Sequence, residues 1–261
     1  MLRIVQLTDM HLYEDPACAL LGVPTEQSFL DTLDQARRDH WPVDCVLATG
    51  DLVHDYSVAA YQRLRGHFQT LDVPVHCLPG NHDDLALMQQ HLAGANVQLS
   101  TSVDNGAWRI VLLDSTVPGS DGGHLAAAQL DHLETQLASA AGRHVLVCLH
   151  HNPLAMGSAW LDTMMVDNGA ALFTVLDRHT TVRGLLWGHV HQHFDTERRG
   201  VRLLASPSTC IQFEPHSAGF ALDDAAPGYR WLNLHDNGRI DTGIARLTNY
   251  SAALDRHSIG Y

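Results

Sequence analysis

Residues 78–83 read LPGNHD, and this stretch decides how the rest of the chain is interpreted. An apolar run, VHCL, leads into a Pro-Gly pair, and three polar side chains then follow in a row: Asn81, His82 and Asp83. A buried strand does not usually end on three polar side chains for packing reasons alone. The stretch therefore predicts a buried strand that carries functional groups at its carboxyl end.

Four other apolar runs end in the same way. Taken in chain order, the polar residues at the five ends are Asp9 and His11, Asp51, Asn81 and His82, His150 and His151, and His189 and His191. Open α/β sheets bind ligands at the carboxyl ends of their strands, and Asp, Asn and His are ligands for divalent transition metals. A lone histidine after a strand is more often a surface residue. Five such ends in one chain favour a shared metal site.

Glycines stand directly before three of these polar residues, at Gly50, Gly80 and Gly188. Glycine allows tight turns where the backbone must approach an ion or a phosphate. The glycines therefore support the same interpretation.

Short apolar runs alternate with longer amphipathic stretches, which predicts an α/β protein. Strands are expected at residues 3–7, 45–48, 75–78, 109–114, 144–149 and 183–187, and helices at 26–39, 57–71, 125–140 and 169–179, with Ser57 as a helix N-cap. Beyond residue 200 the helices fade, and runs at 201–205, 210–213 and 229–235 are expected to complete a second sheet. We expect one domain over residues 1–246 and a loosely held tail over 247–261.

The composition limits the partners. The chain has 261 residues, 45% of them hydrophobic, and a formal net charge of −13 with 16 basic residues, all of them Arg. A nucleic acid or an anionic membrane as the main partner is disfavoured, because both need a basic surface. A small anionic substrate fits if bound metal reverses the local charge. A homo-oligomer is left open.

The five cysteines indicate a reducing compartment. They form no CxxC pair, and Cys45, Cys77 and Cys148 lie inside apolar runs, as small buried hydrophobes do. The first residues are too polar for a signal peptide, and no apolar run approaches the roughly 20 residues of a membrane span. We therefore expect a cytoplasmic protein.

The ordered motifs DMH, GDLVHD, GNHD, HHNP and GHVH, between residues 9 and 191, resemble those of the calcineurin-like metallophosphoesterase superfamily. The stretches LLGVPT at 20–25, GVRLLASPSTCIQFEPHSAGFALD at 200–223 and APGYRWLNLHDNG at 226–238 look like the bacterial class III 3′,5′-cyclic-AMP phosphodiesterases of that superfamily. The resemblance implies an α/β four-layer sandwich, in which two mixed sheets pack face to face with helices outside. His54, Tyr56 and Trp187 depart from the family pattern, and these departures bear on substrate preference.

The resemblance also implies two divalent metal ions, iron, manganese or both, although the ligand types alone would also accept zinc or cobalt. One ion would be held by Asp9, His11 and His191. The other would be held by Asn81, His150 and His189, and Asp51 would bridge the two. A carboxylate can span two cations roughly 3.5–4 Å apart.

The implied reaction is hydrolysis of 3′,5′-cyclic AMP to 5′-AMP by attack of a metal-bound hydroxide on phosphorus. Asn81 and His191 would help to bind the substrate. His82 would meet the phosphate and donate a hydrogen bond or a proton to the leaving oxygen. No covalent enzyme intermediate is required, and the partner is a small cyclic nucleotide.

For three residues in or beside these motifs, the sequence leaves two interpretations open. Asp83 either orients His82 or starts the following helix. His151 is either structural or in direct contact with the site. Asp55 either holds a ligand histidine in one tautomer or is an ordinary exposed acid.

The base pocket and the competing functions also remain open. Ser208, Thr209 and Gln212 are candidates to contact a ribose or base, but ordinary polar residues at strand ends would look the same. The alternatives to a cyclic nucleotide phosphodiesterase are a broad or glycerophosphodiester phosphodiesterase, a nuclease, and a binding scaffold without catalysis. The last two are disfavoured, by the absence of Lys and by the presence of every expected ligand.

Overall fold

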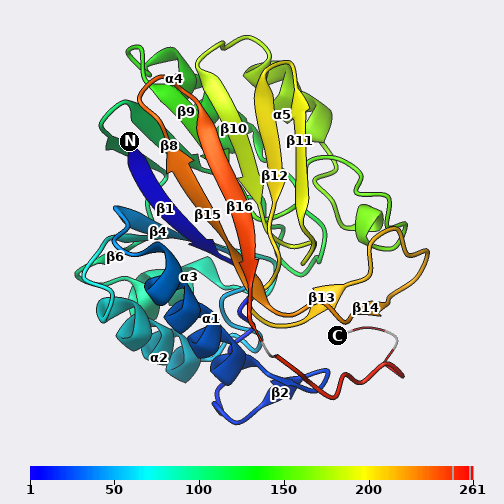
Figure 1. Cartoon of the computed structure of the whole chain (residues 1–261). Helices are drawn as coiled ribbons and strands as arrows, with labels where there is room; N and C mark the ends of the chain where they lie inside the picture. Colours follow the sequence, from blue (N-terminus) through cyan, green and yellow to red (C-terminus); the bar gives the residue numbers. More distant parts are fainter. Residues whose placement is uncertain (249, 259, 261) are drawn as a thin grey trace.

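The structure, a computed structural model, describes residues 1–248, 250–258 and 260. Two six-stranded mixed sheets form its centre (Figure 1). In spatial order, the first contains β16 (Ile240–Arg246), β15 (Gly228–Leu234), β1 (Leu2–Leu7), β4 (Cys45–Thr49), β5 (Val75–Leu78) and β6 (Val97–Gln98). The second contains β11 (Phe194–Arg198), β12 (Val201–Ala205), β10 (Val182–Trp187), β9 (His144–Cys148), β8 (Trp108–Leu112) and β7 (Ser102–Asn105).

The sheets pack face to face because their strands are apolar on both faces. In β4, Cys45 and Leu47 join Ile110, Leu146 and other side chains of the second sheet in a core between the sheets. The alternate residues of β4 join a second core against helices α1 (Thr25–His40) and α2 (Val58–Gln69). A third core joins the second sheet to α4 (Ala127–Ala138) and α5 (Gly169–Leu176). The four layers expected from the resemblance are confirmed.

Short elements connect and cover these layers. They are α3 (Leu85–Leu87), the π-helical turn η1 (Met88–Leu92), the 3₁₀ turn η2 (Leu161–Thr163), the hairpin of β2 (Ala19–Leu20) and β3 (Val23–Pro24), and the pair β13 (Gln212–Phe213) and β14 (Leu222–Asp223).

The helices follow the sequence periodicity. In α1 the side chains of Phe29, Leu33 and Ala36 are buried, and α2 begins after Ser57, whose Oγ accepts a hydrogen bond from the Ala60 backbone N–H at 3.3 Å. The expected N-cap is therefore confirmed.

The expectation for the late strands is wrong in part. Strand β12 lies in the second sheet, but β15 pairs antiparallel with β1 in the first sheet, with Ile4 opposite Leu232. Strand β16, which the sequence did not suggest, pairs with β15 at the sheet edge. Apolar content showed that residues 229–235 form a strand, but it did not identify the sheet, because all the central strands are buried on both faces.

Described residues of the segment from Leu247 onward contact the rest of the chain. The Leu247 N–H donates to the Pro227 carbonyl and the Asp255 N–H to the Leu21 carbonyl, each at 2.9 Å. At Gly22, which has φ +92°, an added Cβ would lie 2.1 Å from the Ala253 carbonyl oxygen. The division into a domain over 1–246 and a tail stays a prediction, and residues 249, 259 and 261 lie outside the described part.

Candidate metal centre

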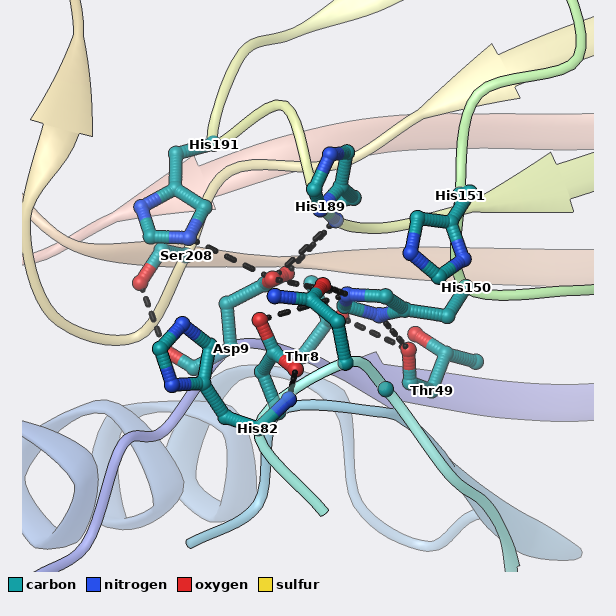
Figure 2. A network of polar contacts seen from close by, with 12 residues as sticks. Thr8, Asp9, Thr49, His82, His150, His151, His189, His191 and Ser208 are labelled. Carbon is teal, nitrogen blue, oxygen red and sulfur yellow. Dashed lines mark hydrogen bonds and ion pairs between the residues drawn. The ribbon is translucent and has the colours of Figure 1, made fainter. Parts of the chain in front are cut away.

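The strand ends that the sequence singled out meet in one place. Strands β1, β4 and β5 run parallel in one sheet, and β9 and β10 run parallel in the other. Their carboxyl ends therefore deliver side chains from both sheets to a common centre. Figure 2 shows His82, His150 and His189 reaching this centre from three different loops.

Three of the histidines are oriented in the same way. His150 Nδ1 lies 2.8 Å from the Thr49 carbonyl oxygen, and His191 Nδ1 lies 2.9 Å from the Ile211 carbonyl oxygen. A carbonyl only accepts, so Nδ1 carries a proton in both rings and Nε2 is the nitrogen left to bind a metal. His11 turns its Nδ1 outward as well, toward His54. Each Nε2 thus faces the centre, as a metal ligand requires.

The inward atoms form two overlapping groups. His191 Nε2 lies 3.3 Å from Asp9 Oδ1 and 3.4 Å from His11 Nε2. His150 Nε2 lies 3.2 Å from Asn81 Oδ1 and 3.2 Å from Asp51 Oδ2. Asp51 Oδ2 is also 3.8 Å from His11 Nε2, so this carboxylate lies near both groups.

The donor atoms fit metal cations. Both ring nitrogens of His189 are buried without a hydrogen-bond partner. Buried polar atoms are rarely left in that state, because the loss of hydration is costly. Asp9, His11 and His191 offer ligand atoms within 4.8 Å of one another, as do Asp9, Asp51 and His150. The ligand roles themselves stay a prediction.

The electrostatics of the centre favour added positive charge. Burial lowers the pKa of His11 and of His189 well below the ordinary value, so both rings are neutral. Burial also lowers the pKa of His150, but the charge of Asp51 more than offsets this and raises it to about 9. Burial opposes ionisation of Asp51, yet the charges of His150 and His82 hold its pKa well below the usual range.

Left-handed backbone is concentrated at the same residues. Positive φ angles occur at Asp9 (56°), His11 (50°), Asp51 (50°), His189 (62°) and His191 (48°). Such conformations cost roughly 1–3 kcal/mol each and persist where the surrounding structure imposes them, often at functional sites. The strained turns direct successive polar side chains toward the centre.

Two of the glycines make room for carboxylates. A Cβ added to Gly80 would lie 2.2 Å from Asp51 Oδ1, and one added to Gly188 would lie 2.7 Å from Asp9 Oδ2. Both glycines are needed for this close approach.

Asp83 has a different role from either expectation. Its carboxylate accepts hydrogen bonds from the backbone N–H groups of Leu52, Val53 and Gly80 and from the Tyr61 hydroxyl. Burial and the nearby Asp51 raise its pKa to about 6. Asp83 therefore ties the loop after β4 to the loop after β5. The residue that caps α3 is Asp84, which accepts from the Leu87 N–H at 2.9 Å.

His54 departs from the family pattern in sequence, and its position beside His11 and His82 gives it a role. Its Nδ1 lies 3.2 Å from His11 Nδ1, and its ring stacks on that of His82 with centroids 4.6 Å apart. Asp55 does not orient a ligand histidine: it accepts from the backbone N–H groups of Glu14 and Ser57. A histidine three residues after Asp51 was the available signal for this contact.

The remaining candidates are buried, and two of them keep a side-chain atom without a hydrogen-bond partner, His151 Nε2 and Thr209 Oγ1. His151 Nδ1 is 2.8 Å from Ser115 Oγ, and its ring lies 4.7 Å from that of His189. Ser208 Oγ donates to the Asp9 carbonyl, and Gln212 Nε2 donates to the Ser208 carbonyl. These buried hydrogen bonds favour a structural role for Ser208 and Gln212.

The family model that describes the calcineurin-like phosphoesterases matches residues 2–193 of the chain. The chain therefore belongs to the calcineurin-like phosphoesterase family. It is 44% identical over 258 residues to the 3′,5′-cyclic adenosine monophosphate phosphodiesterase CpdA of Pseudomonas aeruginosa, an alignment that covers 99% of this chain and 94% of that protein. It is 37% identical over 246 residues to the 3′,5′-cyclic-nucleotide phosphodiesterase alr5338 of a Nostoc species, covering 94% of this chain and 92% of that protein.

Solved structures share the fold. A dimetal phosphatase from Danio rerio superposes with a TM-score of 0.65 at 18% identity, covering 88% of this chain and 94% of that one. The purple acid phosphatase PPD1 from yellow lupin gives a TM-score of 0.66 at 14% identity, covering 97% of this chain and 52% of that one. Membership of this family implies divalent metal ions, and the His and Asp cluster fits them. In the part of the chain that the structure describes, no helix combines the length and apolarity needed to cross a membrane.

Proposed function

We propose that the chain is a dinuclear-metal phosphodiesterase that hydrolyses 3′,5′-cyclic AMP to 5′-AMP. The observation that carries the proposal is the set of inward-facing donors from five strand ends, with His82 beside them. The substrate is supported by relatives over 40% identical along nearly their whole length that are named cyclic-AMP phosphodiesterases.

The proposed ligand sets follow the geometry. Asp9, His11 and His191 would hold one ion, Asn81, His150 and His189 the other, and Asp51 would bridge them, with iron or manganese as the ions. When bound, two divalent ions lower the pKa of water toward neutral and offset phosphate charge. Four added positive charges against two carboxylates also make the pocket attractive to an anion, although the chain as a whole is acidic.

The chain's own residues would position the substrate and move the leaving proton. The Asn81 amide and the His191 ring would help to bind the phosphate oxygens. The His82 backbone N–H donates to Asp51 Oδ1 at 2.9 Å, which fixes the loop that carries the His82 ring. As water adds to phosphorus and the bond to the ribose 3′ oxygen breaks, the His82 ring would give a proton to that oxygen.

The test is turnover of cyclic AMP, cyclic GMP and glycerophosphodiesters by protein reconstituted with Mn²⁺ or Fe²⁺, with bound metal assayed. We expect cyclic AMP to be the preferred substrate, chelation to remove activity and either ion to restore it. A preference for a glycerophosphodiester would show that cyclic AMP is not the substrate. Full activity in metal-free protein would reject the mechanism. We also propose a cytoplasmic location, which fractionation of the source cells would test.

A further inference from the structure

Most side chains of the proposed metal centre are shielded from solvent. Asp9, His11, Asp51, His150, His189 and His191 are at most 1% exposed. Asn81 and His82 are partly exposed. Within the described part of the chain, a substrate therefore approaches these groups over the loop that follows β5.

A hollow of about 520 Å³ opens beside this loop. That volume lies in the range of small-molecule sites, about 300–1,000 Å³. Its walls come from the loop after β4, the β5–α3 connection and the loop after β8. The lining includes Tyr56, Asn81, Leu85, Asp114, Thr116 and Pro118.

Two apolar side chains that line this hollow are unusually exposed. Tyr56 is 51% exposed and Leu85 is 38% exposed, and they are two of the four exposed large hydrophobic residues in the described chain. Tyr56 also has φ +56°, an uncommon conformation for a bulky residue. Its hydroxyl lies 3.5 Å from the Asn81 carbonyl oxygen, at the limit of a hydrogen bond. This weak contact does not explain why the Tyr56 ring is exposed or why its backbone adopts an unfavourable conformation.

The charge of the hollow limits what can occupy it. The described lining includes the acidic residues Asp83, Asp84 and Asp114 and no Arg. A second phosphate would be repelled, whereas a neutral group with N–H donors would be accepted. Asp114 is held in place because its Oδ1 accepts from both the Thr116 N–H and the Thr116 hydroxyl. A flat apolar ring with an amino group at its edge fits these features.

We propose that this hollow binds the adenine base of the substrate. The Tyr56 ring supplies the stacking surface and the Asp114 carboxylate accepts from the exocyclic amino group. The inference rests on the proposed cyclic-AMP activity and adds a base subsite to it. It also gives a role to Tyr56, one of the residues at which the sequence departs from the family pattern.

The first test compares cyclic AMP with a ribose 3′,5′-cyclic phosphate that lacks the base. Stacking of a base on an aromatic side chain predicts that Tyr56→Ala loses roughly 5- to 150-fold in kcat/KM on cyclic AMP. Tyr56→Phe should stay within about twofold, since the ring is retained. The control is Val58→Ala, because Val58 is 37% exposed but lies outside the lining. The base subsite would be overturned if Tyr56→Ala lost kcat/KM equally on both substrates, or if it lost none.

The second test concerns the amino group. Cyclic IMP lacks it, so the wild type should prefer cyclic AMP. In Asp114→Asn, which keeps an acceptor for Thr116, that preference should fall by roughly 3- to 10-fold, the value of one hydrogen bond. An unchanged preference would remove Asp114 from the subsite.

Binding separates this inference from the proposed function. Calorimetry on metal-loaded protein should show tighter binding of 5′-AMP than of ribose 5-phosphate, and Tyr56→Ala should abolish the difference. If the wild type does not hydrolyse cyclic AMP, the proposed function fails, while the 5′-AMP comparison still tests the base subsite. Tyr56-dependent turnover of glycerophosphocholine without base-dependent binding would place a cationic headgroup in the hollow and overturn the inference.

Discussion

His54 Nδ1 lies 3.2 Å from His11 Nδ1, on the side of the His11 ring that faces away from the metal centre. The ring of His54 also stacks on His82, with an interplanar angle of 17°. One imidazole thus contacts both a proposed metal ligand and the proposed proton donor.

His54 should therefore affect metal binding without being a ligand. Groups that orient a metal-bound histidine typically contribute roughly 10- to 100-fold to metal affinity. We predict that His54→Ala loses metal affinity in that range, measured as Mn²⁺ binding by calorimetry. His132→Ala is the control, because the His132 ring lies on the protein surface, 3.4 Å from the Thr101 carbonyl oxygen. If His54→Ala binds Mn²⁺ with the affinity of the wild type, the contact with His11 does not contribute to metal binding.

Asp51 should matter more for metal content than Asn81. Asp51 Oδ2 lies within 3.8 Å of His11 Nε2 and 3.2 Å of His150 Nε2, whereas the Asn81 amide is placed against His150. We expect Asp51→Ala to lose more bound metal per chain than Asn81→Ala after dialysis, as measured by elemental analysis. Two tightly bound ions in Asp51→Ala would contradict the bridging role.

His82 should matter most when the leaving oxygen is a poor one. A ribose 3′ alkoxide leaves badly without a proton, whereas a nitrophenolate leaves well. General acid catalysis is typically worth roughly 10²- to 10⁴-fold, so His82→Ala should lose about that much on cyclic AMP and much less on a nitrophenyl phosphodiester. The comparison is made on the chemical step with metal content verified. Equal losses on both substrates would leave His82 as a phosphate-positioning group only.

The ion pairs of Glu26 should make the free energy of unfolding depend on pH in the acid range. Arg63 and His67 both bond to its carboxylate, which is 9% exposed. Burial raises the pKa of Glu26, but these bonds and charges outweigh burial and lower it below the ordinary value of 4.5. The carboxylate therefore stabilises the fold fully above that value, and the contribution disappears as the pH falls through the lowered pKa.

The test is urea unfolding of Glu26→Gln and wild type between pH 7 and pH 4. We predict a deficit of about 1–2 kcal/mol at neutral pH, which narrows below about pH 4.5. Glu134→Gln is the matched control: Glu134 also pairs with an Arg and a His, but it is 40% exposed. Its effect should stay within about 0.5 kcal/mol. A Glu26→Gln deficit that is constant with pH would refute the ionic origin.

The sequence predicted the strand ends well for a physical reason. Polar residues directly after a buried apolar run must lie at the carboxyl end of a strand. The positions of Asp9, Asp51 and His150 along the chain were therefore enough to place them together. The left-handed backbone at these positions could not be predicted, because Asp and His adopt it far less readily than glycine does. The position of β15 was also inaccessible, since antiparallel pairing with β1 depends on contacts more than 200 residues apart.

Strand β1, which leads into Asp9, lies between β4 and β15. Strand β1 therefore remains uncovered on one edge until β15, more than 200 residues later in the chain, has been synthesised. A growing chain that has passed residue 191 already carries every proposed ligand, yet β1 still presents an unpaired apolar edge until residues 228–234 emerge. A chain that stops between residues 191 and 228 should consequently be more prone to aggregation, and depend more on chaperones, than one that includes β15.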